Sequence, residues 1–237
     1  MENTDDQFYL NGHDYSVTCA CLTKYNYLVS ADIKGNVVVW KNYKIKKKIN
    51  DFRKKINTIS EINESQQRIA ILSFDSEQVK FYDLRYVGME PLATIDNIKG
   101  SGFQNNMLKL NPNILAISGT YIYIIDINSF LLIHSINCFF ANNCITTSLR
   151  LIRNKGYFFV SQAYTNNWND DIEKGTIGYY EYDFINPMIP DYNTLYKNAE
   201  KVHAHDHFIK SIRVIDSDTI VSGSADGKIK FWKLKEI

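Results

Sequence analysis

Few features of this 237-residue sequence mark it as secreted, membrane-spanning or strongly charged. Its 4 cysteines are too few and too unevenly placed for a disulfide-stapled fold or a four-thiolate zinc site. Lys and Arg number 27 against 26 for Asp and Glu, so the overall charge gives no attraction towards nucleic acid or an anionic membrane. The first residues contain no basic region followed by an apolar run, which is the pattern of a secretory signal. We therefore expect a cytoplasmic or nuclear protein of the eukaryotic, intracellular type.

Long uninterrupted hydrophobic runs are also missing. The most apolar stretch, residues 113–140, contains Asp126, Asn128, His134 and Asn137. Each of these would cost a few kcal/mol near the centre of a bilayer. Two consecutive buried strands therefore explain the stretch better than a transmembrane helix.

A repeat of strand-like segments is the main positive feature of the sequence. Apolar runs rich in β-branched and aromatic residues end in an aromatic residue or Ile, and Asp or Lys follows. These run ends stand at Trp40, Tyr82, Ile125, Tyr182 and Trp232. The steps between them are 42, 43, 57 and 50 residues, and about 40 to 45 residues is the length of a four-stranded β-meander. Because helical spacing is absent, the sequence predicts an all-β protein of about five four-stranded units.

The first and last units share a motif at identical offsets. "GHDYSVTCA" and "AHDHFIKSI" open these two units, and "LVSADIKGNVVVW" and "IVSGSADGKIKFW" follow them. With these residues the sequence resembles the WD-repeat β-propeller family over essentially the whole chain. The resemblance implies a single β-propeller domain over residues 1–237. Its blades would lie at about 11–50, 51–97, 98–139, 140–199 and 200–237.

The resemblance also implies a structural network. In the family a His, a Ser, an Asp and a Trp form a buried hydrogen-bonded chain, in which each group satisfies the next without water. The matching positions are His205, Ser222, Asp226 and Trp232 in the last unit, and His13, Ser30 and Trp40 in the first. In the first unit Lys34 stands at the Asp position and Asp32 lies two residues earlier. The middle units have no repeat His and carry Tyr or Ile in place of Trp, so we expect them to rely on apolar packing.

The last unit ends after its third strand, and the first unit is preceded by an extra strand-like segment, residues 6–10. Family propellers close when one terminus supplies the missing strand to the blade at the other terminus. We therefore expect residues 6–10 to complete the last blade, because closure removes an open sheet edge. Two alternatives are an open ring completed by the strands of a partner, and a chain that is part of something longer.

A propeller of this kind would serve as a non-catalytic protein–protein interaction scaffold or adaptor subunit of a larger complex. The candidate partner-binding residues are Tyr15, Arg53, Lys54, Lys55, Trp168, His203 and His207. Trp168 stands in an extended turn, residues 164–176, where an aromatic side chain is a common interface anchor. The alternative is that this insertion folds over a blade edge and buries the indole.

Residues 41–55 form a basic strip with eight Lys or Arg and one Asp. The structural interpretation is a solvated outer strand, whose lysines block unwanted strand pairing. The functional alternative is docking of an anionic ligand, either an acidic peptide, RNA or phosphoinositide head groups. That alternative predicts steep salt dependence and loss of binding when residues 46–48 are neutralised.

No motif for catalysis, a cofactor or a metal emerges from the sequence. "HAHDH" could align three histidines for Zn²⁺, but the repeat already explains His205 and no nearby Cys or Glu completes a set. "FYDLR" is similar to the box by which some WD-repeat receptors dock onto a cullin-type ubiquitin ligase, although Arg85 could instead pair with a neighbouring carboxylate. Hydrolysis at a five-bladed pore would need facing carboxylates on the innermost strands. We predict a protein that is not an enzyme.

Overall fold

A computed structural model describes residues 9–73, 75–86, 90–99, 107–118, 121–136, 144–152, 157–164, 174–181, 200–207, 209–216 and 218–233. These residues form strands, turns and irregular segments, and none of them belongs to a helix that could cross a membrane. The all-β prediction is confirmed. The chain divides into two compact units, residues 1–76 with 80–92 and residues 77–79 with 93–237, and each is described by itself. The single domain over residues 1–237 stays a prediction.

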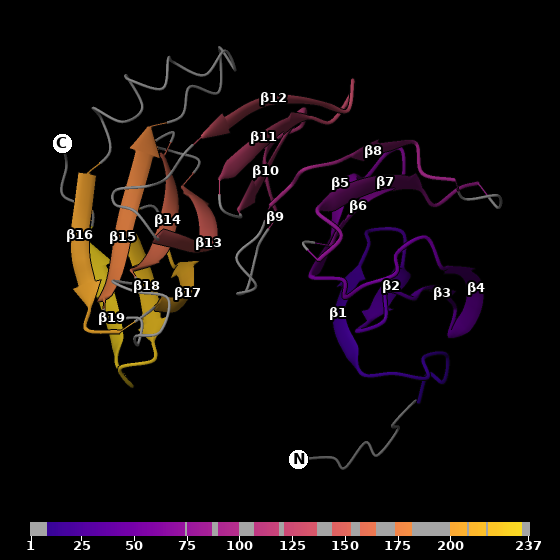
Figure 1. Ribbon diagram of the computed structural model, residues 1–237, viewed down its shortest axis with the longest axis horizontal. Coiled ribbons are helices and arrows are strands. Elements are labelled where there is room, and N and C mark those ends of the chain that lie inside the picture. The colour runs from indigo at the N-terminus through magenta and orange to yellow at the C-terminus, as the bar shows by residue number, and fades with distance from the viewer. Residues whose placement is uncertain are drawn as a thin grey trace. The chain divides into compact units, whose positions relative to one another are not determined.

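The first unit contains the first sheet and most of the second, drawn in indigo and purple in Figure 1. In both sheets the strands lie in chain order. The first sheet consists of β1 (Val17–Leu22), β2 (Tyr27–Asp32), β3 (Val37–Lys41) and β4 (Lys44–Ile49). The second consists of β5 (Thr58–Asn63), β6 (Arg68–Ser73), β7 (Gln78–Asp83) and β8 (Ala93–Ile95). Neighbouring strands of the first sheet pair antiparallel, so this sheet is a simple up-and-down meander.

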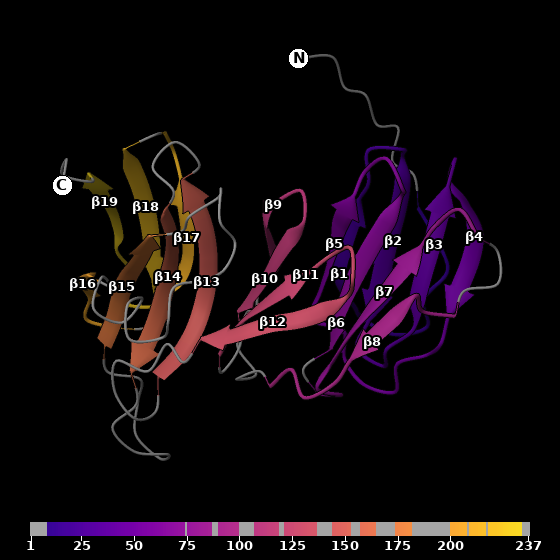
Figure 2. The ribbon, with the colours of Figure 1, turned by 90° about the horizontal axis from the view of Figure 1, so that it is seen from above.

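The second unit contains the remaining three sheets. The third sheet consists of β9 (Met107–Asn111), β10 (Ile114–Ser118), β11 (Ile122–Asp126) and β12 (Leu131–Ile136). The fourth consists of β13 (Cys144–Ile152), β14 (Tyr157–Tyr164), β15 (Lys174–Glu181) and β16 (Glu200–His205). The fifth consists of β17 (Ile209–Val214), β18 (Thr219–Ser224) and β19 (Ile229–Lys233). Figure 2 shows β17 beside β13, so the innermost strands of the fourth and fifth sheets are neighbours.

Two details differ from the expected blade boundaries. Strand β16 pairs with β15 and belongs to the fourth sheet, whereas the sequence assigned residues 200–205 to the fifth unit. The repeat motif begins in this strand with His205, because the outer strand of one blade leads directly into the loop of the next. The fifth sheet has three strands among the described residues. Residues 6–8 lie outside the described part and Tyr9 and Leu10 are in no strand, so pairing of residues 6–10 with β19 stays a prediction.

The central strands of the first three sheets are largely apolar because both of their faces are buried. All five residues of β10 are buried, and four of the five in β3 are buried. The outer strand β4 is different, since most of its residues are exposed and only Ile49 at its end is fully covered. This gradient from centre to edge explains why the third strand of each unit is easy to read in the sequence and the fourth is weak.

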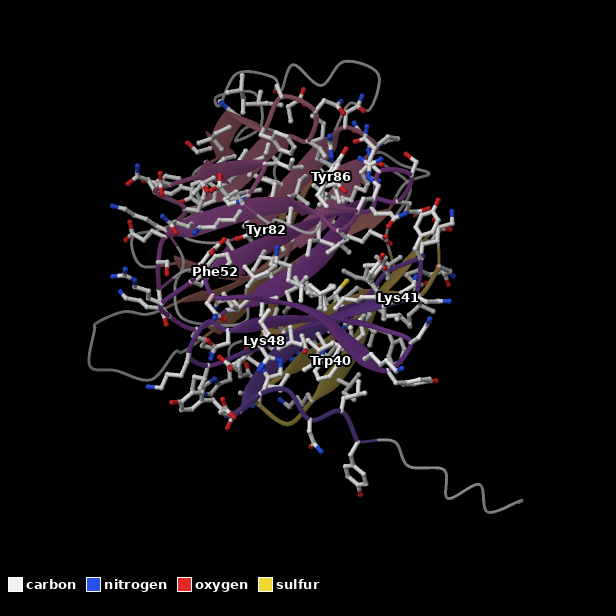
Figure 3. The ribbon with its side chains drawn as sticks, turned by 90° about the vertical axis from the view of Figure 1, so that its right-hand side faces the viewer. Trp40, Lys41, Lys48, Phe52, Tyr82 and Tyr86 are labelled. Atoms are coloured by element: carbon white, nitrogen blue, oxygen red, sulfur yellow. The ribbon has the colours of Figure 1, made fainter. Side chains whose placement is uncertain are left out.

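A single apolar cluster joins the first and second sheets within the first unit. Val29, Ala31, Val37 and Val39 of the first sheet belong to the same cluster as Ile59, Ile69 and Ile71 of the second. Phe52 and Tyr82, labelled in Figure 3, belong to the same cluster. Each buried Val or Ile contributes roughly 1.5 to 3 kcal/mol relative to an exposed one. The loops at the ends of these two sheets are therefore held by a well-packed interior.

Candidate functional site

The first sheet carries a chain of side-chain hydrogen bonds that runs from Trp40 to Asp32. The Trp40 indole Nε1 donates to Ser30 Oγ at 2.8 Å, and Ser30 Oγ lies 2.8 Å from His13 Nε2. On its other side His13 Nδ1 lies 3.2 Å from Asp32 Oδ2. An indole can only donate, so the Ser30 hydroxyl donates onward to Nε2 and His13 Nδ1–H donates to the carboxylate. The chain fixes the loop before β1 to the turn between β2 and β3.

Asp32 also organises that turn. Its Oδ1 accepts the Lys34 and Asn36 amides at 2.9 and 3.0 Å, and its Oδ2 accepts Asn36 Nδ2 at 2.8 Å. The Asp32 side chain is fully buried. Burial alone would raise the pKa of Asp32, but the hydrogen bonds from Asn36, His13 and Lys34 hold that pKa below its ordinary value. Lys34 itself takes no part in the chain through its side chain, whose Nζ lies 5.7 Å from the centre of the Tyr15 ring.

The fifth sheet carries a second chain with the same order of groups. Trp232 Nε1 donates to Ser222 Oγ at 2.8 Å, and Ser222 Oγ lies 2.7 Å from His205 Nε2. His205 Nδ1 lies 2.9 Å from Asp226 Oδ2. Nδ1–H of His205 donates to the Asp226 carboxylate and Nε2 accepts the Ser222 hydroxyl, so no nitrogen lone pair is left for a metal ion. Among the described residues no group of three or more His, Cys, Asp or Glu could hold a metal ion.

The turn around Asp226 is held by fewer bonds to the carboxylate. Asp226 Oδ1 accepts the Lys228 amide at 2.9 Å, and Oδ2 also accepts the Asp206 amide at 3.3 Å. Ser224 occupies the place that Asp32 has in the first sheet, and its hydroxyl accepts the Asp226 amide and donates to the His207 carbonyl. Burial alone would raise the pKa of Asp226, but the bonds from the Lys228 amide and the His205 ring hold it well below its ordinary value.

The second and third sheets are packed by apolar side chains, as expected for the middle blades, and other polar groups also tie them to their loops. Tyr82, which replaces Trp in the second sheet, donates its hydroxyl to Asp51 Oδ2 at 3.0 Å. Burial and the Asp51 carboxylate raise the pKa of Tyr82, so the phenol stays protonated and keeps donating. In the third sheet the Tyr123 hydroxyl accepts the Lys99 amide at 2.9 Å. The Tyr at the Trp position was the available signal for the first of these bonds.

The loops and turns held by the first chain form one surface, which we call the His-loop face and define by Tyr15, Ile33, Lys34, Arg53 and Lys54. Tyr15 and Ile33 are about half exposed, and the three cations are exposed. The Ile33 amide donates to the Ser16 carbonyl at 3.0 Å, and Lys54 Nζ donates to the Asp75 carbonyl at 2.8 Å. These bonds place an aromatic ring, an aliphatic side chain and three positive charges on one end of the first unit.

Gly35 allows the β2–β3 turn to contact the loop of residues 52–54 directly. It has a φ of +90°, and a Cβ at this position would lie 2.6 Å from the Lys54 carbonyl and 2.7 Å from the Phe52 carbonyl. Such a close approach between backbones is available only to glycine. The turn between β2 and β3 therefore rests directly on the loop that carries Arg53 and Lys54.

The candidate partner-binding residues are distributed over both units. Tyr15, Arg53, Lys54 and a half-buried Lys55 lie at the His-loop end of the first unit. His207 belongs to the second unit, where it is half-buried and its carbonyl accepts Ser224. His203 lies in β16 with its side chain outside the described part, and Trp168 lies outside the described residues altogether.

The basic strip lies mainly on the edge of the first sheet. Strand β4 exposes Lys44, Lys46 and Lys48, and the following loop carries the cations of the His-loop face. Figure 3 labels Lys41 and Lys48, which lie at opposite ends of the β3–β4 hairpin. The strip thus covers an outer strand, as the structural interpretation expected.

Arg85 of the "FYDLR" segment has a partner within the chain. Its Nη2 lies 2.6 Å from Asp83 Oδ2, and its Nε donates to Asp83 Oδ1 at 2.9 Å. The Asp83 side chain is almost completely buried, and the guanidinium is part-exposed. This two-point pair is the neighbouring-carboxylate alternative, so the segment gives no separate support for docking onto a ubiquitin ligase.

Comparison with known proteins identifies the fold. Residues 197–233 match the family model described as WD domain, G-beta repeat. Similar solved structures include a chain of a mitotic checkpoint complex (TM-score 0.70, 14% identity, 95% of this chain and 65% of that chain). Another is the β-propeller domain of Myceliophteria thermophila Cps50 (Swd1), with a TM-score of 0.65 and 12% identity over 94% of this chain and 67% of that chain. A third is the WD40 β-propeller domain of Doa1, with a TM-score of 0.64 and 11% identity over 96% of this chain and 67% of that chain. No curated protein sequence matched. The chain spans about two thirds of the length of these structures.

Proposed function

We propose that this chain, which has a WD repeat at residues 197–233 and a fold similar to WD-repeat β-propellers, is a non-catalytic adaptor subunit that binds a protein partner through the His-loop face. The fold in general supports protein-interaction scaffolds. The observation that carries the proposal is the grouping of Tyr15 and Ile33 with three exposed cations on loops fixed by buried hydrogen bonds. No step of the proposal requires a cofactor or a metal ion.

Rigidity is the first reason to choose this face. Binding costs less when the contacting loops are already ordered, because their conformational entropy has been lost on folding. Here the loop before β1 is held by His13, and the turn that carries Ile33 is held by Asp32 and by the Gly35 contact. Exposed aromatic side chains on such a frame are typical interface anchors.

Charge is the second reason. Lys34, Arg53, Lys54 and Lys55 lie at this end of the first unit, against the exposed carboxylates of Asp14 and Asp75. The surplus of positive charge favours a partner segment that carries acidic residues beside an apolar anchor. Trp168, His203 and His207 remain proposed contributors from the second unit.

The proposal is tested in two steps. Cross-linking mass spectrometry on native complexes identifies the partner and the contacting lysines, and affinity for that partner is then measured for Tyr15→Ala and Arg53→Glu. Loss of an aromatic anchor at an interface costs about 2 kcal/mol, so we expect roughly a thirtyfold weaker affinity for Tyr15→Ala. Trp168→Ala combined with Lys54→Glu should weaken capture further.

The matched control is Leu131→Ala, which removes an exposed side chain of β12 in the second unit. It should leave the affinity unchanged, and thermal unfolding should show that every variant is folded. Unchanged partner affinity in both Tyr15→Ala and Arg53→Glu would exclude the His-loop face.

A further inference from the structure

The opposite end of the first unit carries a second exposed surface, which we call the tyrosine end and define by Leu22, Tyr25, Tyr43 and Tyr86. Their side chains are 69%, 43%, 71% and 63% exposed. Leu22 ends β1, Tyr25 lies in the β1–β2 turn, Tyr43 in the β3–β4 turn, and Tyr86 follows β7. Strands β1 and β3 both run away from the His-loop face, so these residues project from the far end of the sheets.

Residues in the turns of the tyrosine end have strained, left-handed backbone conformations, although the aromatic side chains of these turns are exposed. Asn42 and Tyr43 form the β3–β4 turn with φ values of +50° and +60°, and Asn26 has a φ of +57°. Left-handed backbone suits Asn or Gly at a two-residue hairpin turn and is uncommon for a bulky residue such as Tyr. The Tyr43 ring gains little burial in return, since it is mostly exposed. A strained and exposed aromatic residue is a reason to look for a binding role.

Bonds between the turns join the two sheets into one surface. The Lys24 amide donates to Glu61 at 3.1 Å, and Lys24 Nζ lies 2.6 Å from Glu64. Lys41 Nζ donates to the Tyr25 carbonyl and lies 4.2 Å from the centre of the Tyr27 ring. Figure 3 shows the labelled Lys41 on the opposite side of the unit from Phe52.

The charge around the tyrosine end is positive. The cations are Lys24, Lys41, Lys44, Lys46, Lys47 and Arg85, and the carboxylates are Glu61, Glu64, Asp83 and Glu90. Three of these four carboxylates are bound to Lys24 or Arg85. The lysines of β4 continue from the turn along the exposed edge of the sheet. A surplus of positive charge therefore lies beside the projecting rings.

We propose that the tyrosine end docks onto the surface of an anionic membrane. Tyr rings are favoured at the boundary between lipid head groups and water, and each nearby Lys or Arg adds attraction to anionic lipid. A protein that contacts a membrane through apolar insertion alone, or through basic residues alone, binds only marginally. The tyrosine end combines side chains for shallow apolar insertion with a basic sheet edge. Leu22 distinguishes this ligand from RNA, because an exposed aliphatic side chain gains from contact with lipid and offers no stacking surface to a base.

This surface is separate from the His-loop face, so the adaptor could hold its protein partner at a membrane. Vesicle co-sedimentation tests the proposal, with phosphatidylcholine vesicles compared with vesicles that contain one fifth phosphatidylserine. We expect binding only to the anionic vesicles, and weaker binding as salt is raised. Lys44→Glu with Lys46→Glu should reduce the partition coefficient by roughly thirtyfold or more, because two attractive charges become repulsive.

Tyr43→Gly separates binding from folding. Glycine relieves the left-handed strain at residue 43, so the variant should unfold at the same or a higher temperature and yet bind the anionic vesicles several-fold more weakly. Lys99→Glu with Lys233→Glu is the charge-matched control, since both lysines are exposed and lie in the second unit. It should leave vesicle binding unchanged.

Three outcomes would overturn membrane docking. The first is equal binding to neutral and anionic vesicles, and the second is an equal loss in the control and test reversals. The third is binding to a single-stranded RNA oligonucleotide without binding to vesicles. None of these outcomes bears on the His-loop face, whose test uses different residues and a different readout.

Discussion

The first and fifth sheets build the same hydrogen-bonded chain from different positions in the sequence. His and Ser are 17 residues apart in both, and Ser and Trp are 10 apart in both. The carboxylate, however, is two residues after Ser30 in the first sheet and four after Ser222 in the fifth. The chain therefore needs a carboxylate within reach of the His Nδ1 atom, and the turn between the second and third strands can supply it from either end.

The two turns also differ in what surrounds them. Asp32 is completely buried and accepts three hydrogen bonds from its own turn, whereas Asp226 keeps 7% of its side chain exposed and accepts one from its own turn. Gly35 rests on the carbonyls of Phe52 and Lys54, whereas a Cβ at Gly227 would meet nothing within 4 Å. The first turn is thus part of a packed interior, and the last turn is a local structure.

Alanine at the two glycines should show the largest difference between the turns. Gly35→Ala adds a clash with two backbone carbonyls to the strain of a left-handed backbone, so we expect a loss of about 3 to 5 kcal/mol in the free energy of unfolding. Gly227→Ala carries only the strain, at about 1 to 2 kcal/mol. Urea unfolding followed by circular dichroism measures both. Equal losses would show that the first turn is no more packed than the last.

Removal of the carboxylates should give the next largest difference. Asp32→Ala leaves the His13 ring and two turn amides without an acceptor in a buried site, so we expect a loss of roughly 2 to 3 kcal/mol. Asp226→Ala should cost less, because water can reach its turn. Moving the carboxylate in the first turn, by Asp32→Ser with Lys34→Asp, tests whether the two arrangements are interchangeable. Full recovery of stability would show that the carboxylate can stand at either residue 32 or residue 34. No recovery would show that the packed turn requires Asp32.

Acid should weaken both chains. The folded pKa values of Asp32 and Asp226 lie below the unfolded value near 4, so their stabilisation is present above about pH 4 and is lost as the pH falls through the folded values. We expect the urea midpoint to fall between pH 5 and pH 2.5. In the double variant Asp32→Asn with Asp226→Asn, the urea midpoint should fall less over the same pH range, because neither side chain can be protonated. An unchanged pH dependence in the double variant would assign the acid sensitivity to other groups.

Tyr82→Phe extends the comparison to the second sheet and should have the smallest effect. It removes one hydrogen bond to Asp51 and keeps the buried ring, so a loss of about 1 kcal/mol is expected. Trp40→Phe should lower the free energy of unfolding by more, because it removes the first hydrogen bond of the chain and leaves space around a smaller ring. Equal losses would show that a single bond and a four-residue chain stabilise their blades similarly. Thermal unfolding measures both variants.

Much of the fold could be predicted because its signals are periodic. Trp40 and Trp232 end apolar strands at a fixed distance from Ser, and buried strands such as β10 are recognisable from composition alone. The link from Asp32 could not be predicted by motif position, since its reach to His13 depends on the conformation of the turn. For the Tyr82 to Asp51 bond only the Tyr at the Trp position could be read from the sequence, because its partner Asp51 is 31 residues away and the two meet only after the sheets have packed.

The functional surfaces were harder to predict than the fold. Arg53 and Lys54 were recognisable as charged loop residues, but their position beside Ile33 follows from the contact of Gly35 with the neighbouring loop. The tyrosine end left no motif, because Tyr25, Tyr43 and Tyr86 come from separate turns. Residues that gather through packing share no spacing in the sequence.

The two hydrogen-bonded chains also determine how this protein can be observed. Of its 3 tryptophans, Trp40 is buried in the first chain and Trp232 is part-exposed in the other. The Trp168→Phe variant would retain only these two tryptophans. Its fluorescence would combine shorter-wavelength emission from the buried Trp40 indole and longer-wavelength emission from the more solvent-exposed Trp232 indole. The emission spectrum of a single sample would then report separately on the first and last blades as they melt.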